Sequence, residues 1–272
     1  MEKNENMKIG TQIFSVQGKT ALVTGATGNL GTAMALILAE AGAHVLVNSR
    51  SQERSETLVT KLVNAGYSAE SAVFDVTKTN EIEKFFSNLS GKPLHILINN
   101  AYTGGSGSIE MSNADSYTNS YDISVIAAHN LILLGMPALK KAVEQDGDAS
   151  VINLTTMYAL VSPDQRIYDN VCGINPPFYG AAKAALLQWT RYAACEFGPV
   201  GIRINSISPG PFPSKSVQSS NPDFILKLNN KVPMGRIGSA HEIKGPTLFL
   251  ASSASSYVNG SNIVVDGGWT CW

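Results

Sequence analysis

The chain has 272 residues, of which 44% are hydrophobic, and a formal net charge of −1. This length allows one large domain or two small ones with a sizeable core, and the near-neutral charge argues against nucleic-acid or membrane-surface partners. The three cysteines follow no metal-ligand spacing and are odd in number, so we expect reduced thiols in the cytoplasm, no disulfide scaffold and no metal site.

Apolar runs of strand length alternate with segments of helical spacing along the chain. The expected strands cover residues 20–25, 44–49, 71–76, 94–101, 150–156, 202–210 and 262–268. The expected helices cover residues 31–42, 51–66, 79–90, a long region ending near 145, 179–198 and 224–231. Uninterrupted apolar strands are typical of a parallel sheet covered on both faces. The alternation predicts an α/β fold, a Rossmann-type doubly wound sheet of about seven parallel strands with helices on both faces.

The domain organisation is expected to be simple. No linker rich in Pro, Gly or Ser divides the chain, so we expect an N-terminal extension over residues 1–16 and a single domain over residues 17–272. The extension is polar, lacks the apolar stretch of a signal peptide, and is expected to settle onto the domain near Ile13 and Phe14. No apolar run reaches the roughly 20 residues that span a bilayer.

A glycine-rich turn follows the first expected strand. It reads TGATGNLG over residues 24–31 and leads directly into a helix. Glycines let the backbone turn tightly and approach a pyrophosphate, and a helix N-terminus offers free N–H groups and a favourable dipole. The order of strand, turn and helix therefore favours dinucleotide binding over an ordinary loop. We expect the cofactor to contact Gly25, Thr27, Asn29, Leu30 and Gly31.

The end of the second expected strand indicates which dinucleotide binds. An NAD site usually places a carboxylate about 20 residues after the glycines, whereas this chain has Ser49 followed by Arg50. A cation without a carboxylate suits a 2′-phosphate, so NADP(H) is the preferred cofactor and NAD(H) is possible. The alternative is an exposed arginine on a solvated turn.

A tyrosine and a lysine four residues apart begin the expected helix 179–198. Tyr179 and Lys183 therefore lie on one helical face. A free phenol has a pKa of about 10, and a neighbouring ammonium lowers that pKa by stabilising the phenolate. Tyr179 can then exchange a proton with a carbonyl or hydroxyl oxygen as a hydride moves. The spacing alone is a weak signal, because an aromatic core residue and a surface lysine produce it too.

Further motifs strengthen this interpretation. The glycine turn, Asp75 in FDVT, Asn99-Asn100-Ala101, YGAAK and Pro209-Gly210 occur together in this order. Together they resemble the short-chain dehydrogenase/reductase family, in its shorter single-domain branch, over about residues 17–272. The resemblance implies a nicotinamide cofactor and hydride transfer to or from a carbonyl or alcohol carbon. It also implies a homo-oligomer, a tetramer or a dimer.

The resemblance assigns roles to single residues. Tyr179 matches the catalytic acid/base, and Lys183 matches the lysine that binds the nicotinamide ribose and tunes the tyrosine. Thr156 falls at the place of a substrate-orienting serine, with Thr155 as the competing choice, and its hydroxyl can make the same hydrogen bond. The other cofactor contacts that the family implies are Asp75 and Val76 at the adenine, Asn99 and Ala101 along the cofactor, and Pro209, Gly210 and Phe212 beside the nicotinamide.

Two residues depart from the family pattern near this site. Tyr102 stands where a glycine is usual, and we expect it to narrow the active-site mouth and to contact substrate. Ser124 stands where the family has an asparagine that supports a water in the proton relay, and its hydroxyl could hold a water less securely. An alternative alignment would use Asn130, two turns further along the helix.

The largest departure is an insertion at residues 157–178, which separates Thr156 from Tyr179. Our functional interpretation is that it lines the pocket, with Tyr158 touching substrate and Arg166 holding a carboxylate or phosphate. The alternative is a surface excursion or a subunit contact. A substrate lid is expected at residues 212–233, irregular before its short helix, and the alternative there is a disordered surface loop.

The sequence therefore predicts an NADP-dependent short-chain dehydrogenase/reductase that acts on a small polar carbonyl or alcohol. The insertion and the ending GGWTCW resemble bacterial members associated with sugar acids and polysaccharide sugars. The enzymatic alternative is a 3-oxoacyl thioester reductase. An alternative of another class is a catalytically weak NADP(H)-binding or scaffold protein, which the departures at Tyr102 and Ser124 would support.

Overall fold

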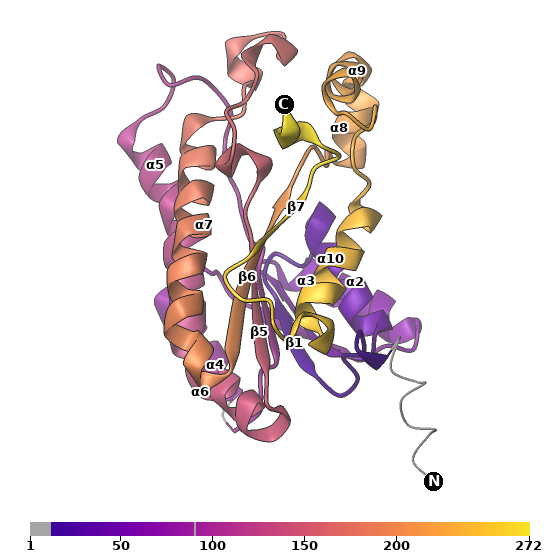
Figure 1. Ribbon diagram of the computed structural model, residues 1–272, viewed down its shortest axis with the longest axis vertical. Helices are drawn as coiled ribbons and strands as arrows, with labels where there is room; N and C mark the ends of the chain where they lie inside the picture. The colour runs from indigo at the N-terminus through magenta and orange to yellow at the C-terminus, as the bar shows by residue number, and fades with distance from the viewer. Residues whose placement is uncertain (1–11, 90) are drawn as a thin grey trace.

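The computed structural model describes residues 12–89 and 91–272 and has three layers, with a parallel sheet between two layers of helices (Figure 1). The strands are β1 Thr20–Val23, β2 His44–Ser49, β3 Ala69–Val73, β4 Ile96–Asn99, β5 Ala149–Leu154, β6 Ile202–Pro209 and β7 Asn262–Val265. All pairings are parallel, in the order β3-β2-β1-β4-β5-β6-β7. The predicted seven-stranded doubly wound sheet is thus confirmed.

Nine α-helices, α2 to α10, are found among the described residues. They are α2 Asn29–Glu40, α3 Gln52–Asn64, α4 Thr79–Asn88, α5 Ala114–Tyr121, α6 Ala127–Asp146, α7 Pro177–Phe197, α8 Lys215–Ser220, α9 Pro222–Lys231 and α10 Lys244–Ala251. A π-helical turn, Asp122–Ile126, joins α5 to α6. The helices α8 and α10 were not expected from the sequence. The predicted lid is therefore not irregular before its last helix, because the hydroxyl of Ser214 caps a first helix at Val217 N.

Alternate residues of each strand pack against opposite helical layers. Ala21 and Val23 face a core with α2, α3 and α10, whereas Leu22 between them faces a core with α4, α6 and α7. This alternation follows from the two-residue period of a strand. Because both faces are covered, the central strands β1, β4, β5 and β6 are almost fully buried. The rigid sheet places the loops at its carboxyl ends, the upper end in Figure 1.

The beginning of the described chain packs on the domain. Residues 1–11 of the expected extension lie outside the described residues. The carbonyl oxygen of Ile13 accepts hydrogen bonds from Ala254 N and Ser253 Oγ, so the chain contacts the domain there as expected.

The helical region Ala114–Asp146 is long and apolar enough to cross a bilayer by length and composition alone. Half of its most apolar window is buried in the domain, and core helices meet the same criteria, so this is weak evidence for a membrane span.

Candidate active site

A cavity of about 620 Å³ lies at the carboxyl ends of the strands. This volume is ordinary for a small-molecule or cofactor site, and the position beside β1 and β4 is the switch point of the sheet. Most of the residues predicted from the sequence line it: Gly25, Thr27, Asn29, Leu30, Gly31, Ser49, Arg50, Asp75, Val76, Ala101, Tyr102, Thr156, Tyr179, Lys183, Pro209, Gly210 and Phe212. Four predicted residues do not line it: Asn99, Ser124, Tyr158 and Arg166.

The glycine turn brings the backbone close to this cavity. Gly25 has a φ of 59°, a conformation that favours glycine. A Cβ on Gly31 would lie 2.2 Å from the carbonyl oxygen of Gly25, so no side chain fits there. No side chain caps the start of α2 in the described structure, and no acidic residue lies in its first turn. The first N–H groups of α2 are therefore free to bind an anion such as a pyrophosphate.

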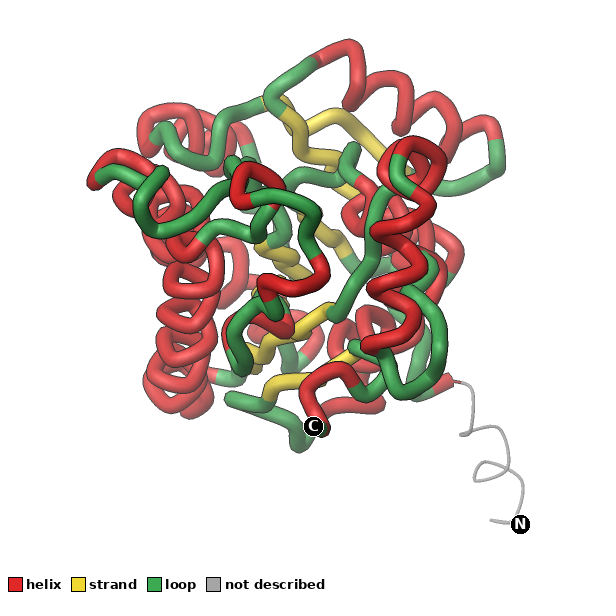
Figure 2. The backbone as a smooth tube through the Cα atoms, turned by 90° about the horizontal axis from the view of Figure 1, so that it is seen from above, coloured by secondary structure: helices red, strands yellow, loops and turns green. Residues whose placement is uncertain are grey.

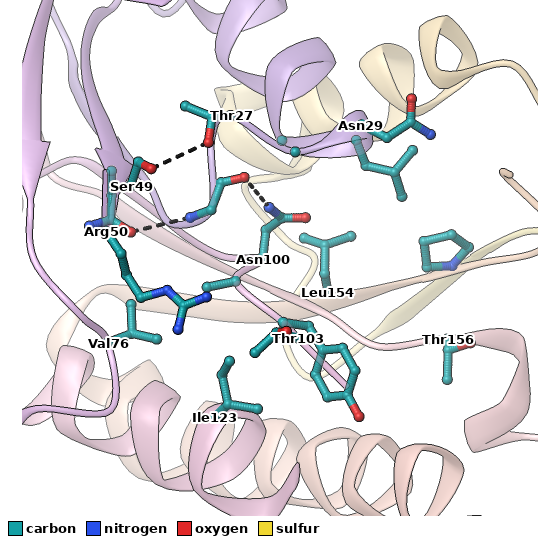
Figure 3. Close-up of a pocket in the computed structure, with 18 of the residues that line it drawn as sticks. Thr27, Asn29, Ser49, Arg50, Val76, Asn100, Thr103, Ile123, Leu154 and Thr156 are labelled. Carbon is teal, nitrogen blue, oxygen red and sulfur yellow. Dashed lines mark hydrogen bonds between the residues drawn. The ribbon is translucent and has the colours of Figure 1, made fainter. Parts of the chain in front are cut away.

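A second group of polar residues lies at the end of β2 (Figure 3). The hydroxyl of Thr27 is 3.4 Å from that of Ser49, and Arg50, 64% exposed, extends along the cavity with its Nη1 3.9 Å from Asp75. Arg54, in the first turn of α3, also lines the cavity. Guanidinium groups and hydroxyls that line one cavity suit a phosphate on a ribose. The sequence analysis did not single out Arg54.

The two asparagines after β4 point in opposite directions. Asn100 Nδ2 donates to the carbonyl oxygens of Thr24 and Gly25, which ties this loop to the glycine turn (Figure 3). Asn99 instead donates from Nδ2 to Asn153 Oδ1 beneath the large cavity. Because successive side chains of a strand alternate between its faces, Asn100 lines the large cavity, whereas Asn99 is not among its lining residues. The expected contact of Asn99 with the cofactor stays a prediction.

Thr156 and Tyr179 meet at the wall of the cavity. Burial raises the pKa of the Tyr179 phenol, and the nearby hydroxyl of Thr156 partly opposes that rise. The competing Thr155 also lines the cavity, but its hydroxyl already has partners, at 2.6 Å from Ser208 Oγ and 3.0 Å from the carbonyl oxygen of Ile207. The geometry therefore selects Thr156 as the partner of Tyr179.

Lys183 is buried one turn after Tyr179. Its ammonium donates to the carbonyl oxygen of Leu154 at 2.7 Å, and burial lowers the pKa of Lys183 to about 7. The expected lowering of the pKa of Tyr179 by this ammonium is wrong for the structure, because burial outweighs any such effect. At neutral pH, Tyr179 is thus a protonated phenol.

Known proteins are similar to this chain in sequence and in fold. The family model described as enoyl-(acyl carrier protein) reductase matches residues 25–270. The chain belongs to the short-chain dehydrogenase/reductase family. A tropinone reductase homolog of Arabidopsis thaliana is 33% identical over 97% of this chain and 95% of its own length. A 2-dehydro-3-deoxy-D-gluconate 5-dehydrogenase of Dickeya dadantii is 32% identical over 94% of this chain and 97% of its own length.

A solved structure extends the likeness. The gluconate 5-dehydrogenase of Burkholderia cenocepacia, in complex with NADP and tartrate, is 26% identical and has a TM-score of 0.84 over 96% of this chain and 98% of its own. The predicted family and fold are thereby confirmed, and the chain is an oxidoreductase of the short-chain dehydrogenase/reductase family.

The position where the family has an asparagine is occupied here by Ser124 on the π-helical turn. Ser124 is buried and lines a small cavity, of about 10 Å³, together with Asn99 and Lys183. Such a volume is close to that of one water molecule. Asn130 bonds Thr79 Oγ1 on the outside of α6 instead. The structure therefore favours Ser124 over Asn130 as the counterpart of the family's asparagine, although Ser124 lies beneath the large cavity and not in it.

The insertion at 157–178 does not line the large cavity. Arg166 is 88% exposed, and its guanidinium bonds both carboxylate oxygens of Asp164. A nearby aspartate in the same short turn thus holds Arg166 at the surface. The hydroxyl of Tyr158 lies 3.3 Å from that of Tyr168, and its ring packs on Trp269. The substrate contacts expected of Arg166 and Tyr158 stay predictions.

Other lining residues carry no recognisable sequence signal. Thr103, Ile123 and Leu154 are among them and are labelled in Figure 3. Their positions depend on the path of loops and on the π-helical turn, which local patterns do not specify. Within residues 12–89 and 91–272, no cluster of three or more His, Cys, Asp or Glu side chains could hold a metal ion.

Proposed function

We propose that this protein is an NADP(H)-dependent oxidoreductase that interconverts a carbonyl and a secondary alcohol in a small polar substrate of the sugar or keto-acid type. One observation carries the proposal: Thr156 and Tyr179 share one cavity with the glycine turn and with Arg50. An acid/base pair and a phosphate-binding region are thus joined in one space. When bound, the nicotinamide supplies or accepts the hydride.

The side chains of this site act on the proton. In the reducing direction Tyr179 donates its phenolic proton to the substrate oxygen, and burial supports this because it raises the phenol's pKa and keeps the proton in place. Thr156 hydrogen-bonds the same substrate oxygen and orients it. In the oxidising direction Tyr179 would accept the proton of the alcohol as a phenolate, a form that burial disfavours at neutral pH. Lys183 supplies the ammonium that would bind the hydroxyls of the nicotinamide ribose.

The preference for NADP(H) over NAD(H) is supported by charge. Arg50 and Arg54 line the same cavity as Thr27 and Ser49, and the lining residues at the end of β2 include no carboxylate. A ribose 2′-phosphate would gain charge-assisted hydrogen bonds here, whereas a free 2′-hydroxyl would gain little. The relative from Burkholderia cenocepacia was solved with NADP.

The substrate class is supported by relatives. Two of them are named as dehydrogenases of gluconate or of a deoxygluconate derivative, and one of those was solved with tartrate, a small hydroxy acid. The proposal includes a cytoplasmic homo-oligomer, a tetramer or a dimer. Leu133 on α6 and Tyr192 on α7 are 56% and 69% exposed, and apolar side chains of this kind are suited to a subunit contact. A monomeric mass by light scattering would contradict the assembly.

The decisive experiment follows NADPH oxidation with ketoses, keto-sugar acids and acetoacetyl thioesters. Tyr179→Phe should lose at least about a hundredfold in turnover, the lower range for a positioned acid. Tyr192→Phe, an exposed tyrosine of the same helix, is the matched control and should keep the parental rate. Turnover confined to the thioesters would reject the sugar-type substrate. Tight NADPH binding without turnover on any compound would favour a binding protein.

A further inference from the structure

Hydrogen bonds fix the backbone directly before Tyr102. The N–H groups of Asn100 and Ala101 both donate to Thr24 Oγ1, at 2.9 and 3.1 Å. The next residues of the loop pass close to the Tyr102 side chain. A Cβ on Gly104 would lie 2.6 Å from the Tyr102 ring and from its hydroxyl. The tyrosine is therefore enclosed by its own loop.

The ring of Tyr102 touches both members of the Tyr179–Lys183 pair. Its centroid lies 4.7 Å from that of Tyr179, with the planes tilted by 57°. The ammonium of Lys183 lies 5.2 Å from the centroid of the Tyr102 ring. Both distances are within the ranges for aromatic and cation–π contacts. A small residue at position 102 would leave both groups without this surface.

The hydroxyl of Tyr102 is anchored at the other end. It lies 3.0 Å from Ser120 Oγ, and Ser120 Oγ donates to the carbonyl oxygen of Phe178 at 3.1 Å. Burial raises the pKa of Tyr102, so its hydroxyl stays protonated and can donate to Ser120. This chain of hydrogen bonds ends on the residue directly before Tyr179.

The surroundings of Lys183 leave few other groups to hold its charge. No ion pair among the described residues includes Lys183. Its polar contact is the carbonyl oxygen of Leu154 on β5. The Tyr102 ring faces it from the β4–α5 loop, and Tyr179 precedes it by one turn on α7. The aromatic face of Tyr102 can therefore attract the Lys183 cation.

We propose that Tyr102 is a positioning residue for the proton-transfer pair: its ring holds the Lys183 ammonium and the Tyr179 phenol, and Ser120 holds the ring. This inference rests on the proposed function for its catalytic consequence. Its physical core, a cation–π contact on Lys183, exists without substrate and without turnover.

The first experiment measures the pKa of Lys183 by NMR in cofactor-free protein with isotope-labelled lysine. Lys183→Met identifies the signal. Tyr102→Leu keeps an apolar side chain in place but removes the aromatic face, so the pKa of Lys183 should fall by about 0.4 to 1.5 units. Tyr102→Phe keeps the face and should leave that pKa at the parental value. An unchanged pKa in folded Tyr102→Leu would overturn the proposal, even if no carbonyl substrate is ever found.

The second experiment tests the anchor with a double-mutant cycle. Tyr102→Phe and Ser120→Ala each remove the same hydrogen bond and should each lower kcat about threefold to tenfold, with a smaller change in KM. The double variant should fall no further than the single ones. Losses in kcat that multiply in the double variant would show that the two hydroxyls act independently, against the proposed anchor. Because both substitutions are small, thermal unfolding serves as the check on the fold.

Discussion

The ammonium of Lys231 lies 2.7 Å from Oδ2 of Asp164 and joins the end of α9 to the insertion. A second ion pair, between Lys227 and Asp169, connects the same two segments one helical turn earlier. The Lys231 ammonium also lies 5.6 Å from the ring centroid of Trp269. A hydrophobic cluster that includes Ile167 and Leu228 also joins the insertion to α9, so the two segments pack against each other. Helices and loops cover the sheet when it is seen from this end (Figure 2).

Removing the first of these ion pairs should loosen both segments together. Lys231→Met leaves Asp164 with Arg166 alone, so we expect faster amide hydrogen exchange in residues 157–178 and 222–231 at once. If the two segments close over substrate, KM for substrate should rise about twofold to fivefold, the value of a partly exposed ion pair. Arg166→Ala is the matched control, because this exposed side chain contacts Asp164 within the insertion only. Faster exchange in a single segment would show that the two move separately.

The preference for NADP(H) should depend on Arg50. Arg50→Ala removes a charged partner of the 2′-phosphate, and hydrogen bonds to charged groups contribute about 1.5–3 kcal/mol. We therefore expect Kd for NADPH to rise about tenfold to a hundredfold, while Kd for NADH stays nearly constant. Arg191→Ala, on the outer part of α7 with Gln188 as its partner, is the control. Equal weakening of both cofactors would place Arg50 elsewhere than at the 2′-phosphate. Fluorescence titration measures Kd for NADPH and for NADH in the parent protein and in each variant.

Two glycines of the same turn should respond differently to an added methyl group. A Cβ on Gly31 would lie 2.2 Å from Gly25 O and 2.9 Å from Ala26 Cα, and neither backbone atom moves cheaply. A Cβ on Gly28 would meet Gly25 O at 3.3 Å, which a small shift relieves. Gly31→Ala should therefore destabilise the fold by about 1–3 kcal/mol, as overpacking does, and weaken NADPH binding at least tenfold. Gly28→Ala should do much less in thermal unfolding and in titration. Equal effects would contradict the packing argument.

The fold and the centre of the site could be predicted from the sequence because both depend on local patterns. Continuous apolar strands predict a covered parallel sheet, and the glycine turn and the Tyr179–Lys183 spacing depend on neighbours within one turn. The sequence does not tell which of the adjacent Asn99 and Asn100 lines the cavity, since this depends on the register of the strand's alternation. The contacts within the insertion are hard to predict for another reason. Arg166 is held by Asp164, and a pattern of charges does not reveal which pairs form in a loop.

The protonation of Lys183 should change when NADPH binds. Burial lowers the pKa of Lys183 from its ordinary value of 10.5 to about 7, so in cofactor-free protein at pH 8 most of these side chains are neutral. A bound dinucleotide brings negative phosphates and ribose hydroxyls that accept from an ammonium, and both raise the pKa of Lys183. NADPH binding should therefore take up a proton at pH 8, with less uptake as the pH falls and almost none near pH 5.5, where Lys183 is already charged. Calorimetry in two buffers of different ionisation enthalpy measures the uptake, and Lys183→Met should abolish it. Uptake that persists in Lys183→Met would assign the proton to another group.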